Sequence, residues 1–455
     1  MLEKWFKLKE HKTDVKTEIL AGITTFMTMA YILAVNPNLL GTVMDNGAVF
    51  MATALSAAIG TILMALLANY PFALAPGMGL NAFFAFTVVG TMGFSWQLAL
   101  FAVFVEGIIF VILSVTHIRE AIFNAIPMSL KHAVSVGIGL FIAFIGMQNA
   151  KLVVANSSTL VTYQHFTENF SSIGIGALLA LIGTIITAVL LVKKVKGGIL
   201  IGILATWILG IICELVGLYV PDAAVGMYSV MPDFSKGLNL GAIGATFGQA
   251  FNFGAFGDVN ILDFFVVMFS FLFVDMFDTL GTLIGVASKA DMLDKDGKLP
   301  KINGALLADA IATSAGAILG TSTTTTFVES ASGVTEGGRT GLTALTTAVL
   351  FLLSLLLSPI FLAIPSFATA PALIIVGFYM MASVVKIDFD DMSEAIPSFL
   401  CIAAMPFMYS ISEGISIGVI SYTLINLITG KRKKLTPLMY ILTVLFILKY
   451  CFFST

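Results

Sequence analysis

Residues 321–339 read TSTTTTFVESASGVTEGGR and lie between two strongly apolar segments. The stretch holds a run of hydroxyl side chains, the carboxylate of Glu329 and three glycines. A lipid bilayer tolerates irregular or polar backbone only where protein or a water-filled cavity surrounds it. An ionisable group at that depth indicates a functional site. We therefore interpret this stretch as a broken helix that lines a substrate site.

The composition indicates the class of protein. Of the 455 residues, 58% are hydrophobic and only 11% are charged, whereas soluble domains carry roughly 25% charged residues. A helical span needs about 20 apolar residues, and such stretches recur along nearly the whole chain. We therefore expect an all-α polytopic membrane protein with about fourteen transmembrane helices and no soluble domain.

Basic residues predict which side of the membrane each loop occupies. Cytoplasmic loops are enriched in Lys and Arg. Lysines crowd residues 1–16, and basic clusters recur at 193–196 and 431–434. All three fall on one side if residue 1 is inside, which predicts a multi-pass protein of the cell (plasma) membrane with a cytoplasmic N-terminus. Residues 435–453 are apolar again, and the sequence leaves open whether they form an interfacial helix or an extra span.

A second interruption falls in the third expected span. Residues 75–81 read APGMGLN, where proline removes a helical donor and glycine admits non-helical backbone. We expect this span to break near mid-membrane, and a proline kink in a continuous helix is the alternative. The first span is expected to end at Asn36-Pro37.

The order of landmarks predicts an inverted repeat. Interrupted spans at the third and tenth of about fourteen positions suggest two halves of seven. Because seven is odd, the second half enters the membrane in the opposite sense, and paired interrupted helices in such halves mark the central site of a transporter. The landmarks that recur in the same order are residues 46–48 with 303–305, 126–127 with 364–365, and 196–212 with 412–428.

Acidic residues in the eighth span are candidates for the chemistry. Asp275, Asp278 and Thr282 are spaced so that they share one face of a helix over about residues 261–288. Two carboxylates in an apolar helix cost several kcal/mol unless they are neutralised or hydrogen-bonded. The functional interpretation is a polar ligand or proton site, and the alternative is a structural network in which Asp275 accepts bonds from backbone donors freed by a break.

Glu329 carries the same argument at the break itself, between Thr326 and Ser330. A carboxyl group that gains and loses a proton there suits proton coupling. Asn81 follows the other break, and its amide offers a donor and an acceptor together. Phe327 and Phe83 flank the two breaks and could stack on a flat ring, although ordinary packing is the commoner role of phenylalanine in a chain with 38 of them.

Other functional classes find little support. The sequence has no Walker loop, metal-binding His cluster or nucleophile–base constellation, so we expect no enzyme, no cofactor, no metal and no nucleic-acid partner. A passive channel is one alternative to a transporter. An anion transporter is another, but acidic residues at the site disfavour it. The oligomeric state stays open, and a homodimer is compatible with the sequence.

Four long motifs carry a resemblance to a known family. They are AGITTFMTMAYILAVNP (21–37), APGMGLNAFF (75–84), DMFDTLGTLIG (275–285) and TTTTFVESASGVTEGGRTGLT (323–343). Together they resemble the AzgA-like purine permeases of the nucleobase–cation symporter-2 family, and the match spans the whole chain. The uracil and xanthine branch often carries a histidine four residues after the acidic residue of span 8, where this chain has Thr282, which favours the purine branch.

The resemblance implies a fold and a mechanism. It implies a fourteen-span, seven-plus-seven inverted repeat in which short extended segments of spans 3 and 10 meet near the middle. A purine base, guanine or hypoxanthine in preference to adenine, would enter with protons by alternating access, driven by the proton gradient.

The resemblance also assigns domains and roles. The acidic residue of span 8 falls on Asp278, that of span 10 on Glu329, and the asparagine of span 3 on Asn81. Glu329 is expected to be the main ligand of the base, with Asp278 as the first candidate for the proton. The implied segments are a cytoplasmic N-terminus (1–16), a core domain (17–117 and 221–363), a gate domain (118–220 and 364–430) and a basic segment with an apolar helix (431–455).

Overall fold

The computed structural model describes residues 2–116, 126–222, 226–234, 240–257, 260–289, 292 and 299–452. Within these residues ten helices are long and apolar enough to cross a membrane. Shorter apolar helices cover Met78–Thr91, Met392–Phe407 and Pro437–Leu448. The chain is therefore a helical multi-pass membrane protein, as the composition predicts. The expected boundary between residues 117 and 118 and most of the charged loop at 289–301 lie outside the described residues.

The first half of the chain forms seven membrane segments, most of them single helices. After the short helix α1 (Leu2–Phe6), the segments are α2 (Val15–Met29) with α3 (Ile32–Leu40); α4 (Asn46–Leu67); β1 (Leu74–Pro76) with α5 (Met78–Ala82) and the π-helix η1 (Phe83–Thr91); α6 (Trp96–Val115); α8 (Met128–Asn149); α9 (Ile175–Val192) after the turn η2 (Phe170–Gly174); and α10 (Gly198–Leu215). A hairpin of β2 (Val153–Asn156) and β3 (Leu160–Tyr163) links α8 to η2.

The second half repeats this order. Short 3₁₀ turns η5 (Leu240–Ala245), η6 (Gln249–Phe251) and η7 (Phe253–Ala255) precede it. The segments are α11 (Ile261–Lys289); α12 (Ile302–Leu319); β4 (Thr324–Thr326) with α13 (Ser330–Thr335); α14 (Gly341–Ser354) with η8 (Leu355–Leu357) and α15 (Ser358–Phe361); α16 (Ser366–Met381) with η9 (Ala382–Lys386); α17 (Met392–Phe407); and α18 (Ile411–Ile428), followed by η10 (Arg432–Lys434) and α19 (Pro437–Phe452). The apolar stretch after residue 434 is thus a helix, and it packs against α18.

The first span runs further than the sequence predicts. It was expected to end at Asn36-Pro37, but α3 continues to Leu40 and the change of helix falls near Tyr31 instead. Proline is tolerated inside a membrane helix when neighbouring groups satisfy the backbone. Next to the proline, the Asn38 side-chain amide donates to the carbonyl of Ala34 in the preceding turn at 2.9 Å.

Helix packing repeats between the two halves. α4 packs against α14, and the equivalent pair of the other half, α12 and α6, also packs together. In the same way α8 packs against α17 as α16 packs against α9, and α9 packs against α10 as α17 packs against α18. Contacts that recur when the halves are exchanged are the signature of an inverted repeat. The chain therefore has the expected seven-plus-seven inverted-repeat fold.

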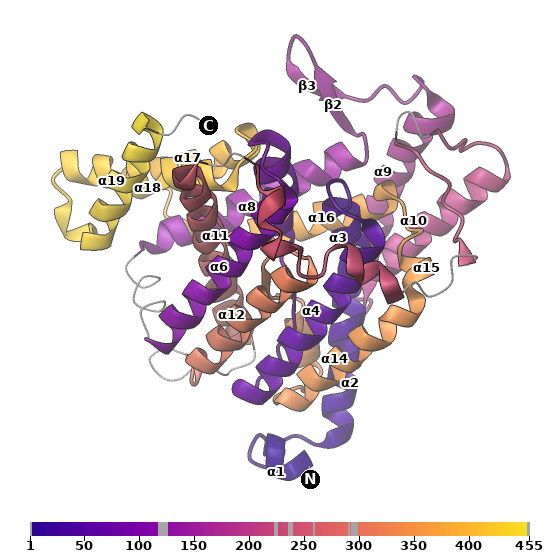
Figure 1. Ribbon diagram of the computed structural model, residues 1–455, viewed down its shortest axis with the longest axis horizontal. Helices are drawn as coiled ribbons and strands as arrows, with labels where there is room; N and C mark the ends of the chain where they lie inside the picture. Colours follow the sequence, from indigo (N-terminus) through magenta and orange to yellow (C-terminus); the bar gives the residue numbers. More distant parts are fainter. Residues whose placement is uncertain are drawn as a thin grey trace.

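The helices divide into two groups by their packing (Figure 1). We call α2, α3, α4, α6, α11, α12, α14 and the two broken spans the strand-bearing group, and α8, α9, α10, α16, α17 and α18 the flanking group. Small residues let the first group pack closely, as expected where lipid supplies no hydrophobic driving force between helices. At the contact of α4 with α12, for example, a methyl group on Gly60 would lie 2.8 Å from Ala312 Cβ.

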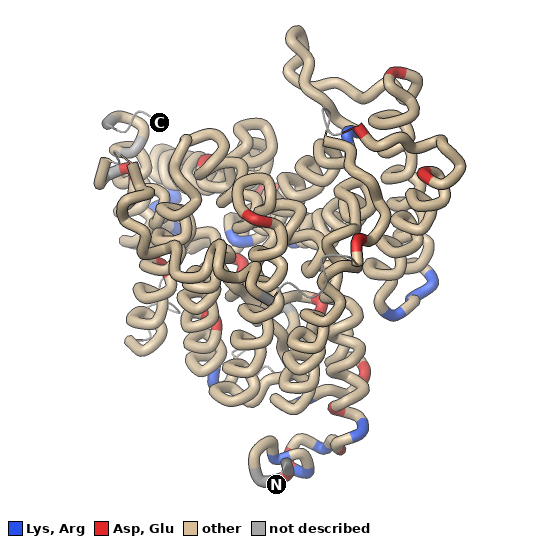
Figure 2. Tube along the Cα trace, turned by 45° about the vertical axis from the view of Figure 1, so that its right-hand side comes forward, with Lys and Arg blue, Asp and Glu red and all other residues tan. Residues whose placement is uncertain are grey.

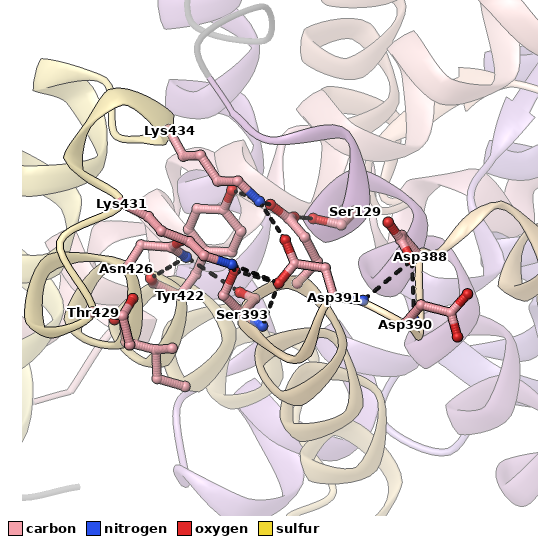
Figure 3. Close-up of polar contacts among 12 residues, drawn as sticks. Ser129, Asp388, Asp390, Asp391, Ser393, Tyr422, Asn426, Thr429, Lys431 and Lys434 are labelled. Atoms are coloured by element: carbon pink, nitrogen blue, oxygen red, sulfur yellow. Dashed lines mark hydrogen bonds and ion pairs between the residues drawn. The ribbon is translucent and has the colours of Figure 1, made fainter.

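Charged residues lie mostly outside the helices, as Figure 2 shows for the basic residues near the N-terminus. One ionic cluster joins the start of α17 to the end of α18 (Figure 3). Asp391 accepts from Lys431 and Lys434, each at 2.8 Å. Lys434 also reaches Glu394 at 2.7 Å. The two lysine hydrogen bonds hold the pKa of Asp391 well below its ordinary value.

Candidate functional site

The two broken spans meet as a two-stranded antiparallel ladder. Leu74 pairs with Thr326, and Pro76 with Thr324. All residues of both strands are buried. The ladder continues beyond the strands, because the Phe327 N–H donates to the carbonyl of residue 73 at 3.0 Å. Both interruptions predicted from the sequence are therefore present, and each is a short strand rather than a kink.

The close contacts of Gly77 explain why this junction needs glycine. Its N–H donates to the Thr323 carbonyl at 3.0 Å. A methyl group at Gly77 would lie 2.7 Å from Thr325 Cγ2, which is closer than side chains pack, and 3.5 Å from Asp278 Oδ2. The missing side chain thus lets the end of β1 lie against both β4 and α11, and it places Asp278 beside the ladder.

Glu329 lies immediately before α13 and is 9% exposed. Its Oε1 accepts a hydrogen bond of 2.6 Å from the hydroxyl of Tyr31. Tyr31 is fully buried at the change from α2 to α3, so this bond ties span 1 to span 10. The sequence did not predict it, because a tyrosine within an apolar span resembles an ordinary packing residue.

Asp278 and Glu329 are directed at the same region. Asp278 is partly exposed, and its carboxyl group interacts electrostatically with that of Glu329 and with Tyr31. Asp278 lies beside Gly77 at one end of the ladder, and Glu329 follows β4 at the other end. The structure therefore places the two acidic residues that the sequence singled out close enough to interact, at opposite ends of the short ladder. Carboxylates are pure acceptors when ionised, so this region suits a ligand that presents N–H groups.

A buried polar cluster lies between α11, α12 and β4. Asp275 Oδ1 accepts from the Thr279 hydroxyl at 2.9 Å, and Asp309 Oδ1 lies 3.0 Å from the same hydroxyl. Thr279 also lies 2.8 Å from the hydroxyl of Thr325. Asp275 was a site candidate from the sequence, whereas Thr279 and Asp309 were not, because their contacts depend on which helices become neighbours.

The other residues named from the sequence have varied surroundings. The Asn81 amide donates to the Pro76 carbonyl at 3.3 Å, so it supports the end of β1. The Ser330 hydroxyl accepts from the backbone N–H of residue 73 at 3.0 Å and holds the start of α13 to span 3. Phe83 packs edge-on against Phe271 with ring centroids 5.0 Å apart.

Phe327 and Thr326 are buried beside the ladder, with exposed fractions of 5% and 2%. Thr282 is partly exposed on α11, one turn beyond Asp278. Thr326 is part of the ladder and Phe327 directly follows it, whereas a role of these three residues in binding stays a prediction.

The geometry and the fold agree with comparison to known proteins. Residues 16–417 match the model of the permease family Xan_ur_permease. The chain belongs to this permease family. It is therefore a transporter rather than an enzyme, as expected, and the resemblance drawn from the four motifs is confirmed.

Two relatives of the permease are similar along their whole lengths. The guanine/hypoxanthine permease PbuG of Bacillus subtilis is 46% identical, over 99% of this chain and 100% of that protein. The adenine permease AdeP of Escherichia coli is 42% identical, over 99% of this chain and 96% of that protein.

Two solved structures resemble the permease in fold alone. The transmembrane domain of the cyanobacterial bicarbonate transporter BicA superposes with a TM-score of 0.60 at 14% identity, and the match covers 89% of this chain and 97% of that domain. The structure of SLC26A9 gives a TM-score of 0.57 at 13% identity, over 92% of this chain and 67% of that one.

Proposed function

We propose that the permease takes up purine nucleobases with protons by alternating access, with guanine and hypoxanthine preferred and adenine as the alternative. The observation that carries this proposal is the pair of acidic residues, Asp278 and Glu329, which lie at opposite ends of the short β1–β4 ladder and interact electrostatically. The names of the relatives, permeases of guanine, hypoxanthine and adenine, support the substrate class.

The carboxylates fit the donor edge of a guanine-like base. Guanine presents a ring N–H and an adjacent amino group, two donors that carboxylate oxygens can accept. Hypoxanthine keeps the ring N–H, whereas the corresponding edge of adenine pairs a donor with an acceptor. Because Oε1 of Glu329 accepts from Tyr31, we assign Oε2 to the base. Asp278 accepts a second N–H, and Phe327 and Thr326 border the base beside the ladder.

The grouping of the helices supports movement of one body against the other. We assign the strand-bearing group to a core domain and the flanking group to a gate domain, so that the whole base site travels with the core. An exposed ion pair, Lys196 Nζ to Glu336 Oε2 at 2.6 Å, joins the two groups at the turn before α10. Exposed pairs contribute about 0–1 kcal/mol, which a moving domain can break and re-form.

A passive nucleobase facilitator is the second candidate, since the same site would also serve facilitated diffusion. An anion transporter fits less well. The resemblance to a bicarbonate transporter extends to the fold, whereas two carboxylates at the ladder would repel an anion.

Uptake of radiolabelled guanine, hypoxanthine and adenine tests the proposal, in cells that lack their own purine permeases and with or without a protonophore. We expect accumulation of guanine or hypoxanthine that collapses with the proton gradient and a permease located in the cell membrane. Equilibration of the base without dependence on the proton gradient would instead establish a facilitator. Absence of uptake of every base by well-expressed protein would refute the substrate class.

A further inference from the structure

Asp275 and Asp309, on two different helices, meet at a single hydroxyl group. Thr279 Oγ1 lies 2.9 Å from Asp275 Oδ1, and 3.0 and 3.2 Å from the two carboxylate oxygens of Asp309. The hydroxyl of Thr325 approaches the same oxygen at 2.8 Å. All four side chains are at most 1% exposed. Two carboxyl groups therefore share one buried hydroxyl, and the fourth partner belongs to β4.

The number of hydrogens at Thr279 limits the protonation of this cluster. A threonine hydroxyl carries one hydrogen and can donate to one acceptor, and an ionised carboxylate only accepts. If Asp275 and Asp309 were both ionised, one of them would face Thr279 Oγ1 with no hydrogen between the two oxygens. If one is a carboxylic acid, it donates to Thr279, Thr279 donates to the other, and Thr325 donates to the remaining lone pair. The geometry therefore fits a pair that holds one proton.

The surroundings favour the same state, because a third carboxyl group, that of Asp278, interacts with the pair. Asp309 interacts electrostatically with Asp278, and carboxylates that share a site resist simultaneous ionisation. Among the described elements packed around the pair, α4, α5, β1 and β4 carry no titratable side chain. The others contribute Glu106 on α6, whose carboxylate accepts from Thr323 of span 10 at 3.0 Å, Glu329 before α13, Lys131 and His132 at the start of α8, Glu413 and Tyr422 on α18, and Asp263 in the first turn of α11.

We infer that Asp275 and Asp309, joined through Thr279, form the proton site of the permease, separate from the carboxylates that hold the base. This inference rests on the proposed proton-coupled uptake and names the residues that couple it. One carboxylic acid of the pair carries the proton across, releases it to water on the cytoplasmic side and becomes a carboxylate. The next proton from outside restores the acid.

Thr325 connects this site to the base. It pairs with Ala75 in the ladder, and its hydroxyl contacts Thr279. A base bound between Asp278 and Glu329, beside the ladder, fixes the position of β4 and therefore of that hydroxyl. It also donates to Asp278, which reduces the repulsion that Asp309 feels. Base and proton thereby stabilise one another, with couplings between two sites typically about 5–150-fold.

Asp309→Asn and Asp275→Asn test the assignment in proteoliposomes, because asparagine imitates the carboxylic acid but cannot release a proton. Two readouts are needed. One is accumulation of labelled hypoxanthine driven by an imposed pH gradient, and the other is counterflow of hypoxanthine at equal pH on both sides. We expect each variant to keep counterflow, to lose accumulation above the external concentration and to lose the pH dependence of counterflow. Asp263→Asn, in the first turn of the same helix, is the matched control and keeps all three properties.

Two results would overturn the inference. One is gradient-driven accumulation with wild-type pH dependence in both variants. The other is loss of counterflow and base binding in variants that remain folded, since the pair would then belong to the base site or to the framework. Thr279→Val provides a second route if either asparagine variant fails to fold, and it is expected to keep counterflow with weakened accumulation.

An infrared measurement separates failure of this inference from failure of the proposed function. The purified wild type is expected to show a protonated carboxyl band near neutral pH that the Asp275→Asn/Asp309→Asn double variant lacks, whether or not any purine is transported. Identical spectra would refute the shared proton. If base transport by the wild type does not depend on the proton gradient, proton coupling is refuted. The carboxyl band would then come from a proton with a structural role only.

Discussion

Replacing Tyr31 by phenylalanine removes one oxygen atom from the site and leaves the ring in place. The lost bond is the 2.6 Å contact to Glu329 Oε1, and both side chains are buried. Hydrogen bonds to charged groups are worth about 1.5–3 kcal/mol. Since about 1.4 kcal/mol corresponds to a tenfold change, we expect the KM for guanine or hypoxanthine to rise about tenfold to a hundredfold, because the ionised carboxylate is both destabilised and free to turn away from the base.

The assay is concentration-dependent uptake of labelled base, with the amount of folded protein measured by size-exclusion chromatography. Tyr219→Phe is a matched control, because that tyrosine is also buried and its hydroxyl donates to a backbone carbonyl at 2.6 Å, that of Tyr228. Wild-type KM in Tyr31→Phe would refute the role of Tyr31 in positioning Glu329. An equal rise in Tyr219→Phe would show that the loss reflects general destabilisation.

Three further variants probe other parts of the structure. Glu329→Gln is expected to reduce uptake more than tenfold, because its amide presents a donor to the N–H edge of the base, and wild-type affinity in radioligand binding would contradict this. Gly77→Ala should be expressed but lose uptake, since its methyl group would lie 2.7 Å from Thr325. Normal uptake would show that β4 can shift to make room for the methyl group. Asp391→Asn keeps the helix cap but removes the carboxylate whose pKa the hydrogen bonds from Lys431 and Lys434 lower. Because its pKa is lowered in the folded protein, Asp391 stabilises the fold above its unfolded pKa of about 3.9, and this stabilisation is lost as the pH falls through the folded-state pKa. The variant should therefore melt at a lower temperature than wild type at neutral pH but not in strong acid, which thermal unfolding measures.

Much of the fold follows from the sequence because the bilayer restricts it. Each span needs an apolar stretch of fixed length, and a departure from that pattern is conspicuous. The hydroxyl run before Glu329 and the Pro76-Gly77 step therefore predict both breaks, and β1 and β4 lie there. The inverted repeat follows from the order of the same landmarks.

The sequence could not predict which side chains meet across spans. Tyr31 and Glu329 are far apart in the chain, and Asp309 was not among the candidate site residues. Their roles appear once α2, α12 and β4 are placed together. The predicted end of the first span was also wrong, because Pro37 signals a break in the sequence, whereas α3 continues through it to Leu40.

The β1–β4 ladder also constrains how the protein is made. Leu74–Pro76 belongs to the first half and pairs with Thr324–Thr326 in the second, so β1 is synthesised and inserted long before its partner strand exists. Until then its backbone groups need water or other protein, because lipid cannot satisfy them. Neither half can complete this ladder alone. The first half therefore stays incomplete during synthesis, and the ladder can form only after residues 324–326 have been made and inserted.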